Sequence, residues 1–408
     1  MKYFPKKLTM TWIRNSYKEG SLTPAELADE IVQRAEKYRD YNIWIVAPDL
    51  KRMMGYIEKL PKDMESLPLW GIPFAVKDNI DVAGCPTTAA CPDYAYDPNE
   101  DATVVKKLIG AGAFPVGKTN LDQFATGLVG TRSPYGEVKN ALDPELISGG
   151  SSSGSAVSVA LGMAAFSLGT DTAGSGRVPA ALNGLVGYKP SLGAWSTKGV
   201  VPACASLDCV TVFANSLEDA EEVNFAARGV DEECCWSREY KEPLPKLPKK
   251  ICLAKDGVTF YGPYADIYKA KWEQAKKRIE DMGITVEYID YTMFSKAASI
   301  LYDGPWVAER WKDLGDFVES HPGKVFPVTE TILRSGDKPE HTARKVFEAM
   351  HQLQEYRMRA RHILKDAVLI MPTAGGTFKE MMSEKIRSRQ TARWDFIQIT
   401  ATCLICVP

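Results

Sequence analysis

Histidine is scarce in this chain, occurring only four times in 408 residues. His321, His341, His351 and His362 all lie in a late region with helical patterns, away from the segments rich in glycine and serine. The metalloprotease pattern His-Glu-x-x-His is missing, and no cysteine and histidine cluster has the spacing of a zinc site. The sequence therefore predicts no metal and no cofactor. A serine–histidine–aspartate triad is not excluded by sequence distance, but nothing supports one.

An excess of charge of one sign is also missing. The formal net charge is −2 and the isoelectric point is about 6.2, which argues against a nucleic-acid partner because such a partner requires a basic face. The start of the chain contains no apolar signal segment, and the most apolar stretch, residues 156–169, is too short to span a membrane. Nine cysteines, an odd number without a recurring spacing, indicate reduced thiols. We expect a cytoplasmic protein without a membrane partner.

Helical and strand patterns alternate along the first half of the chain. Thr23, Pro24 and Glu26 supply an N-cap, a proline at the first helical position and a capping-box glutamate, so a helix is expected to begin there. Further helices are expected over 101–112, 119–128, 154–164 and 177–190, and strands within 69–84 and over 113–117 and 164–171. This alternation predicts an α/β fold with a large, mixed and mostly parallel sheet covered by helices on both faces.

One segment matches the expression for a phosphate-binding P-loop, "GAFPVGKT" at residues 112–119. A P-loop follows a strand and has a small, flexible interior, so that backbone N–H groups can surround phosphate. Here a helical pattern precedes the motif, and its interior is an apolar strand candidate with a proline, Pro115, that has no N–H to donate. Nucleotide binding is therefore kept only as a remote alternative.

Two turns rich in glycine and serine each lead into a predicted helix. The first, residues 149–155, could be a flexible linker, but the apolar segment that follows it must be buried, which argues against a linker. The second, "GTDTAGSGR" at 169–177, has glycines that let successive N–H groups point at one spot, as in an anion or oxyanion site. The nucleophile-elbow pattern Gly-x-Ser-x-Gly is missing around Ser175 in the second turn.

A lysine, Lys77, directly follows an apolar run in "GIPFAVKDNID". It could be a lysine at the end of a strand with its ammonium in water. It could also be a buried amine whose pKa is lowered by loss of solvent, and such a neutral amine can act as a base without any histidine. The residues alone leave both interpretations open.

Together, "GIPFAVKDNID", "SGGSSSGSA" and "GTDTAGSGRVPAALNGLVGYKPS" resemble the three catalytic stretches of the amidase signature family of serine hydrolases. The resemblance implies a single amidase domain over 1–408, with a catalytic core at 70–215 and a helical half at 250–365 that lines the substrate pocket. It implies a triad of Lys77 as base, Ser151 after a cis peptide, and Ser175 as nucleophile. The backbone N–H groups expected in the oxyanion hole are those of Thr172, Ala173, Gly174 and Ser175.

Within this family the chain is most similar to the allophanate hydrolases, including the hydrolase half of urea amidolyase. A match outside the catalytic stretches, "LYDGPWVAERW" at 301–311, implies that Tyr302 and Arg310 hold the carboxylate of the substrate. Arg310 could instead be a surface arginine paired with an acid such as Glu309. Arg177 and Gly127 are further candidates for substrate binding, although Arg177 could equally be a structural partner of Asp171.

The resemblance implies hydrolysis of allophanate, a small molecule, with release of ammonia and CO2, in a homodimer linked functionally to a biotin-dependent urea carboxylase. Two departures bear on this expectation. Arg387-Ser388 and residues 393–396 stand where allophanate hydrolases carry other residues, so the substrate could be another small amide or acyl-urea. The C-terminal domain of full-length allophanate hydrolases is not in the chain. A catalytically silent scaffold is a further alternative.

Overall fold

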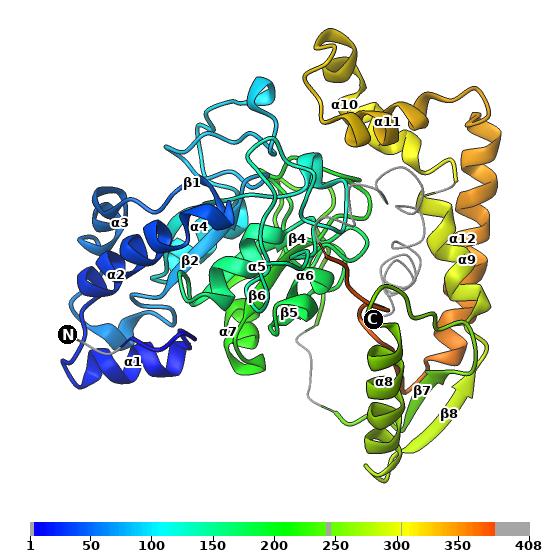
Figure 1. The fold of residues 1–408 in the computed structure, drawn as a ribbon, viewed down its shortest axis with the longest axis horizontal. Helices are drawn as coiled ribbons and strands as arrows, with labels where there is room; N and C mark the ends of the chain where they lie inside the picture. The colour runs from blue at the N-terminus through cyan, green and yellow to red at the C-terminus, as the bar shows by residue number, and fades with distance from the viewer. Residues whose placement is uncertain (1–3, 242–245, 303, 380–408) are drawn as a thin grey trace. The chain divides into compact units, whose positions relative to one another are not determined.

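The computed structural model describes residues 4–241, 246–302 and 304–379 (Figure 1). It divides into two compact units, and we describe each by itself. The first unit comprises Met1–Glu239 with Gly315–Ile332, and the second comprises Tyr240–Leu314 with Leu333–Pro408. The catalytic core expected at 70–215 lies entirely within the first unit.

A six-stranded sheet forms the centre of the first unit, in the order β1-β3-β2-β4-β6-β5. The three central strands β3, β2 and β4 are parallel, whereas the outer strands pair antiparallel to their neighbours. The strands are β1 (Trp44–Val46), β2 (Pro73–Lys77), β3 (Phe114–Thr119), β4 (Phe166–Thr170), β5 (Val186–Tyr188) and β6 (Val210–Ala214). Since β2 and β4 are parallel neighbours, their carboxyl ends, at Lys77 and Thr170, meet at one edge of the sheet.

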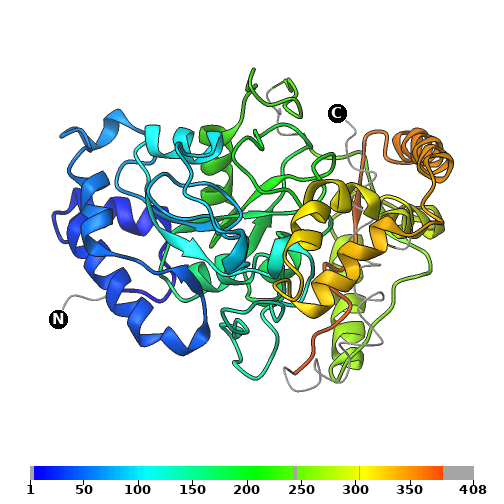
Figure 2. The same ribbon diagram turned by 90° about the horizontal axis from the view of Figure 1, so that it is seen from above.

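Helices pack around this sheet (Figures 1 and 2). α5, which follows the first turn rich in glycine and serine, is buried along its whole length and contacts β2, β3, β4 and β6. α2 begins with the expected capping box, in which Thr23 and Glu26 accept each other's backbone N–H. The helices of this unit are α1 (Met10–Lys18), α2 (Pro24–Lys37), α3 (Leu50–Ile57), α4 (Thr103–Gly110), α5 (Ser153–Ala160), α6 (Arg177–Leu182) and α7 (Leu217–Ala227), with short 3-10 turns at Arg39–Tyr41, Met64–Ser66, Pro92–Tyr94 and Gln123–Ala125.

Two of the expected helices are wrong in part or in whole. The segment 119–128 contains only the 3-10 turn Gln123–Ala125, because the Asp122 carboxylate accepts hydrogen bonds from the amides of Val129, Gly130 and Arg132 and so closes a loop. The helix expected over 177–190 ends at Leu182, and the apolar residues after Gly184 form β5 instead. In both segments tertiary contacts override the local helical pattern.

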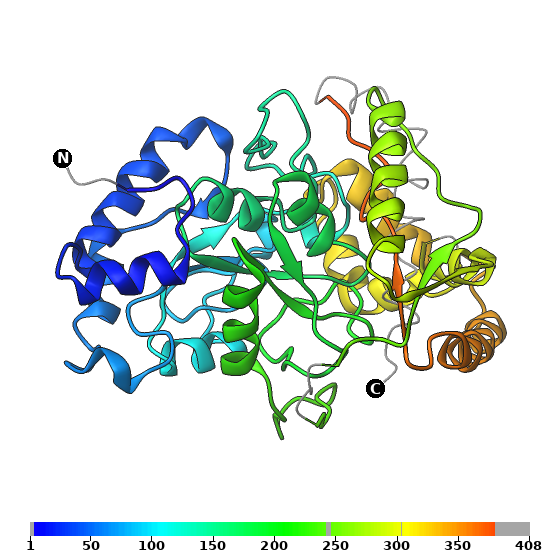
Figure 3. The same cartoon turned by 90° about the horizontal axis from the view of Figure 1, so that it is seen from below.

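The second unit has a separate three-stranded parallel sheet in the order β8-β7-β9, alongside which α8 lies (Figures 1 and 3). Its strands are β7 (Lys250–Ala254), β8 (Thr285–Ile289) and β9 (Ala367–Ile370), and its helices are α8 (Ala265–Glu280), α9 (Thr292–Tyr302) and α12 (Ala343–Ile363), with a 3-10 turn at Ser335–Asp337. α10 (Val307–Ser320) and α11 (Pro327–Arg334) contain residues of both units.

Over the described residues, four strand pairs are parallel and three are antiparallel, divided between two sheets rather than joined in one. The mixed α/β class with a sheet rich in parallel strands is confirmed. None of the helices in residues 4–241, 246–302 and 304–379 has the length and apolar character needed to cross a membrane.

Candidate active site

Lys77 ends β2 with a fully buried side chain, so the interpretation of a solvated strand-end lysine is wrong. Its Nζ lies 2.8 Å from Ser151 Oγ and 2.7 Å from Thr170 Oγ1. Burial lowers the pKa of Lys77 to about 7, against the opposing effect of the Asp122, Asp208 and Asp171 carboxylates. A substantial fraction of this amine is therefore neutral at neutral pH, as a proton acceptor must be.

Ser151 lies in a buried turn that crosses the carboxyl edge of the sheet, and its peptide bond with Gly150 is cis. The turn is held by Asp122, whose N–H donates to the Ser151 carbonyl at 3.0 Å. A Cβ on residue 150 would lie 2.1 Å from Asp122 Oδ2, so only glycine fits there. The structure thus contradicts the linker interpretation of residues 149–155.

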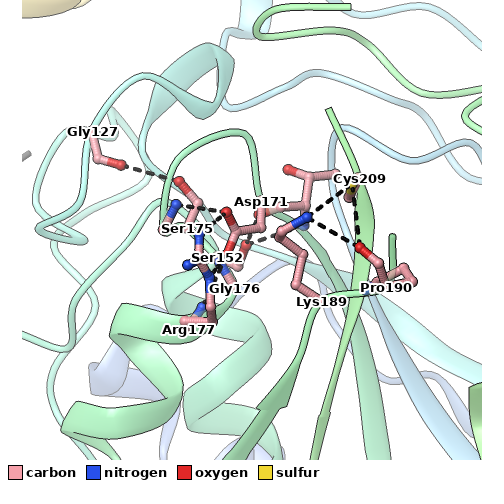
Figure 4. Close-up of polar contacts among 11 residues, drawn as sticks. Gly127, Ser152, Asp171, Ser175, Gly176, Arg177, Lys189, Pro190 and Cys209 are labelled. Atoms are coloured by element: carbon pink, nitrogen blue, oxygen red, sulfur yellow. Dashed lines mark hydrogen bonds and ion pairs between the residues drawn. The ribbon is translucent and has the colours of Figure 1, made fainter. Parts of the chain in front are cut away.

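The second turn, residues 171–177, is organised by the buried carboxylate of Asp171 (Figure 4). This carboxylate accepts hydrogen bonds from the amides of Gly174 and Gly176 at 2.6 and 3.1 Å, and it forms a two-pronged ion pair with Arg177 at 2.8 and 2.9 Å. Burial acts to raise the pKa of Asp171, but the Arg177 guanidinium and the hydrogen bonds outweigh burial and lower the pKa to about 2. The carboxylate is a permanent negative anchor for the turn.

Asp171 bears on two expectations about this turn. The amide of Gly174 is occupied by Asp171, so it cannot also bind an oxyanion. Arg177 makes its ion pair with Asp171, which agrees with the structural alternative. Within the described part of the chain, the amides of Thr172, Ala173 and Ser175 donate no hydrogen bond to the protein and remain available to a ligand.

Ser175 lies next to the Ser151 turn, since the amide of Ser152 donates to the Ser175 carbonyl at 3.4 Å. Ser175 is 6% exposed, and its Oγ lies 3.5 Å from the carbonyl oxygen of Gly127 (Figure 4). Among the hydrogen bonds of the described residues there is none between Ser151 Oγ and Ser175 Oγ. The structure therefore places Lys77 in direct contact with Ser151. Ser175 is held beside the Ser151 turn by its backbone carbonyl, and its hydroxyl faces the carbonyl of Gly127.

The two residues expected to hold a carboxylate belong to the second unit. Arg310 lies on α10 and is 3% exposed, so the interpretation of a surface arginine is wrong. Tyr302 is the last residue of α9, and its side chain lies outside what the structure describes. Residues 387–396, where the sequence departs from allophanate hydrolases, also lie outside the described residues.

The P-loop match at 112–119 does not form a phosphate loop. Phe114–Thr119 is the buried strand β3, and the Lys118 ammonium pairs with Asp78 at 3.4 Å and donates to Thr87 at 2.9 Å. A Cβ on Gly117 would lie 2.5 Å from the carbonyl oxygen of Val46, so this glycine serves strand packing. The lysine and the backbone amides that a phosphate would need are used inside the sheet.

Three site residues were missed by sequence reasoning. Thr170 is the second hydroxyl in contact with Lys77, Asp122 holds the Ser151 turn, and Asp208 accepts a hydrogen bond from the Thr172 hydroxyl. Asp122 was not identified as a site residue because its segment was predicted to be helical. Thr170 stood within the quoted motif, and its position at the end of β4, beside the end of β2, was the available signal.

No group of three or more histidine, cysteine, aspartate or glutamate side chains in the described ranges has an arrangement that could hold a metal ion. The site contains one buried amine, two serines in adjacent turns, and three backbone amides of one turn. Such a set can activate a hydroxyl nucleophile and stabilise a developing oxyanion.

Comparison with known proteins identifies the family. Residues 26–406 match the family model described as Amidase. The chain is 39% identical to the urea amidolyase of Saccharomyces cerevisiae, over 97% of this chain and 22% of the relative, and 43% identical to that of Lachancea kluyveri, over 84% and 19%. It therefore spans about a fifth of the length of these relatives.

Among solved structures, the chain resembles the allophanate hydrolase of Kluyveromyces lactis with a TM-score of 0.87. The two are 36% identical in an alignment that covers 97% of this chain and 66% of the other. The family match spans most of the sequence, and the buried lysine and the two serine turns lie within the matched residues. The chain belongs to the amidase family.

Proposed function

We propose that this chain is an amide hydrolase that uses Ser175 as nucleophile and Ser151 and Lys77 as its proton relay, and that its substrate is allophanate. The observation that carries the proposal is the fully buried Lys77 amine, with a pKa lowered by burial to about 7, at 2.8 Å from Ser151 Oγ. A lysine in this state can accept a proton at neutral pH, which a solvated lysine cannot do.

The reaction begins when Ser175 Oγ attacks the amide carbonyl and forms an acyl-enzyme. For this step the Ser175 hydroxyl turns from Gly127 toward Ser151, which can accept its proton because a hydroxyl both donates and accepts. Ser151 passes a proton to Lys77, and the relay then returns a proton to the leaving nitrogen, so that ammonia departs. The same relay then accepts a proton from a water molecule, which attacks the acyl group and releases it from Ser175.

The negative charge of the tetrahedral intermediate falls next to the 171–177 turn. We assign its stabilisation to the available amides of Thr172, Ala173 and Ser175. Each such donor typically contributes about 2.7–4 kcal/mol to the transition state. The fixed carboxylate of Asp171 supports these amides by holding the turn through Gly174, Gly176 and Arg177.

The substrate assignment rests on likeness to the Kluyveromyces lactis allophanate hydrolase along nearly the whole chain, and on Arg310. Allophanate carries a carboxylate at the end away from the amide that is cut. A buried arginine is suited to bind it, since a guanidinium forms paired hydrogen bonds with a carboxylate. We assign this role to Arg310 together with Tyr302, and we place Gly127 at the wall of the site beside Ser175.

The wider setting follows from the relatives. Their name, urea amidolyase, supports the proposal that a biotin-dependent urea carboxylase supplies the allophanate that this chain consumes. We further propose a cytoplasmic homodimer, on the basis of the composition and the resemblance described above. The products of the complete reaction are ammonia and CO2.

The test is ammonia release by the purified chain from allophanate, with urea, biuret and small primary amides as a substrate panel. Ser175→Ala should abolish release while its thermal unfolding curve stays close to that of the unmodified protein. Ser153→Ala, in the same buried region but outside the relay, serves as the matched control. Rates unchanged in Ser175→Ala would contradict the mechanism, and a preference for another amide in the panel would contradict the substrate alone.

A further inference from the structure

A lysine and a cysteine meet behind the 171–177 turn, outside the groups that the reaction uses. Lys189, which directly follows β5, places its Nζ 3.4 Å from the Sγ of Cys209, which directly precedes β6 (Figure 4). The carbonyl oxygen of Pro190 lies 3.1 Å from this Nζ and 3.8 Å from this Sγ, so one acceptor holds both groups. Cys209 is 3% exposed, whereas Lys189 is half-buried and reaches solvent.

Cys209 is coupled by its backbone to the anchor of the turn. The Asp171 amide donates to the Cys209 carbonyl at 2.8 Å, and the Cys209 amide donates to the Asp171 carbonyl at 3.3 Å. This pair continues the antiparallel ladder of β4 and β6, and residues directly opposite in such a ladder carry their side chains on the same face. The thiol and the Asp171 carboxylate are therefore neighbours.

Lys189 is coupled to the same anchor by charge. Burial acts to raise the pKa of Asp171, and Arg177 lowers it. The Lys189 ammonium is a further group that lowers this pKa. Any reaction that removes the positive charge of Lys189 or displaces Cys209 thus acts on the carboxylate that holds the amides of Gly174 and Gly176.

We propose that Lys189 and Cys209 form an oxidation site, at which a peroxide converts the thiol to a sulfenic acid and the lysine amine then closes a reversible sulfur–nitrogen crosslink. Two nucleophilic side chains already in contact, one of them reaching solvent, provide the geometry for this reaction. A sulfenic acid next to a nitrogen nucleophile condenses with it, and an added thiol reverses the product.

The two steps balance as follows. In the first, the thiol sulfur attacks hydrogen peroxide, the O–O bond breaks, and the products are the sulfenic acid and one water, so sulfur is oxidised by two electrons and the peroxide is reduced. In the second, the Lys189 ammonium gives up one proton to solvent and the resulting amine attacks this sulfur, the S–O bond breaks, an S–N bond forms, and a second water leaves. A thiol reagent then attacks the sulfur, returns the amine, and leaves a mixed disulfide that further thiol reduces.

The crosslink is expected to reduce the activity proposed above. It replaces the Lys189 ammonium by a neutral nitrogen and draws the end of β5 toward the start of β6, beside Asp171. The turn that presents the oxyanion donors rests on that carboxylate, so ammonia release should fall as the crosslink forms and return after reduction.

The experiment uses the full chain with Cys234 and Cys235 replaced by serine, because these thiols are half-buried and exposed and would react first. After treatment with hydrogen peroxide, peptide mapping should find one crosslinked species that joins Lys189 to Cys209 and has lost two hydrogens, and dithiothreitol should cleave it. Lys189→Arg is the matched control, since it keeps the positive charge but removes the amine: its Cys209 should instead react with a sulfenic-acid probe.

Two results would overturn the proposal: a Cys209 that remains a thiol under these conditions, or one that proceeds to sulfinic acid without crosslinking to Lys189. A crosslink that forms with no change in ammonia release would overturn its regulatory part. Because the mass measurement does not depend on turnover, the oxidation site can be tested even if the protein fails to hydrolyse allophanate.

Discussion

Replacement of Lys77 by methionine should change how the stability of the protein depends on pH, quite apart from its effect on activity. Lys77 is fully buried, and burial lowers its pKa from 10.5 to about 7. In the unfolded chain the same amine holds its proton up to the ordinary value. Between these two values the unfolded state binds more protons than the folded state, so stability must rise with pH across this window.

The magnitude follows from the two pKa values. Each tenfold change in proton affinity corresponds to about 1.4 kcal/mol, so a pKa lowered from 10.5 to about 7 makes the buried amine destabilising by about 5 kcal/mol well below pH 7. About 3 to 4 kcal/mol of this penalty should disappear between pH 7 and pH 10. Methionine does not titrate, so the Lys77→Met variant lacks this rise.

The assay is urea-induced unfolding of both proteins at several pH values from 7 to 10. The absolute difference at one pH includes the hydrogen bonds that Ser151 and Thr170 lose in the variant, about 1–3 kcal/mol for each hydroxyl left unpaired. That contribution is constant with pH, and the other titrating groups are common to both proteins. The change of the difference with pH therefore isolates Lys77, and a difference that stays constant from pH 7 to 10 would refute a neutral buried amine.

Three further predictions concern turnover. The kcat/KM for allophanate should fall about tenfold for each pH unit below the lowered pKa of Lys77, about 7, because the protonated amine cannot accept a proton. A profile that is flat from pH 5 to 8 would contradict this role. Thr170→Val should lower kcat about tenfold by removing one of the two hydroxyl contacts of the amine, whereas Thr170→Ser should retain most of it; equal losses in both variants would argue against positioning. Arg310→Ala should raise KM by about ten- to a hundredfold with a smaller effect on kcat, and an unchanged KM would contradict a carboxylate site.

The location of the site could be predicted from the sequence, because its reactive side chains lie where strands end. Lys77 closes an apolar run, and the two turns rich in glycine and serine follow or precede buried segments, so a parallel arrangement brings them to one edge. The capping box at Thr23 was predictable for a local reason, since all of its groups lie within four residues.

What could not be predicted is which of several nearby donors a buried carboxylate binds. The carboxylate of Asp122 closes a loop where the local pattern is helical, and that of Asp171 occupies the Gly174 amide. The pairing of Asp171 with Arg177 was one of two alternatives that the sequence left open. In each case one buried acid selects among several nearby donors. The backbone conformation of each turn decides which donor faces the carboxylate, and the sequence alone left that conformation open.

The division of the chain into two units has an evolutionary consequence. The groups to which we assign bond breaking, Lys77, Ser151 and Ser175, all belong to the first unit, while Tyr302 and Arg310 belong to the second. On these assignments, mutations in the second unit alter substrate binding and leave the groups proposed for bond breaking in place. Substrate preference and bond breaking are then under selection on separate parts of the sequence.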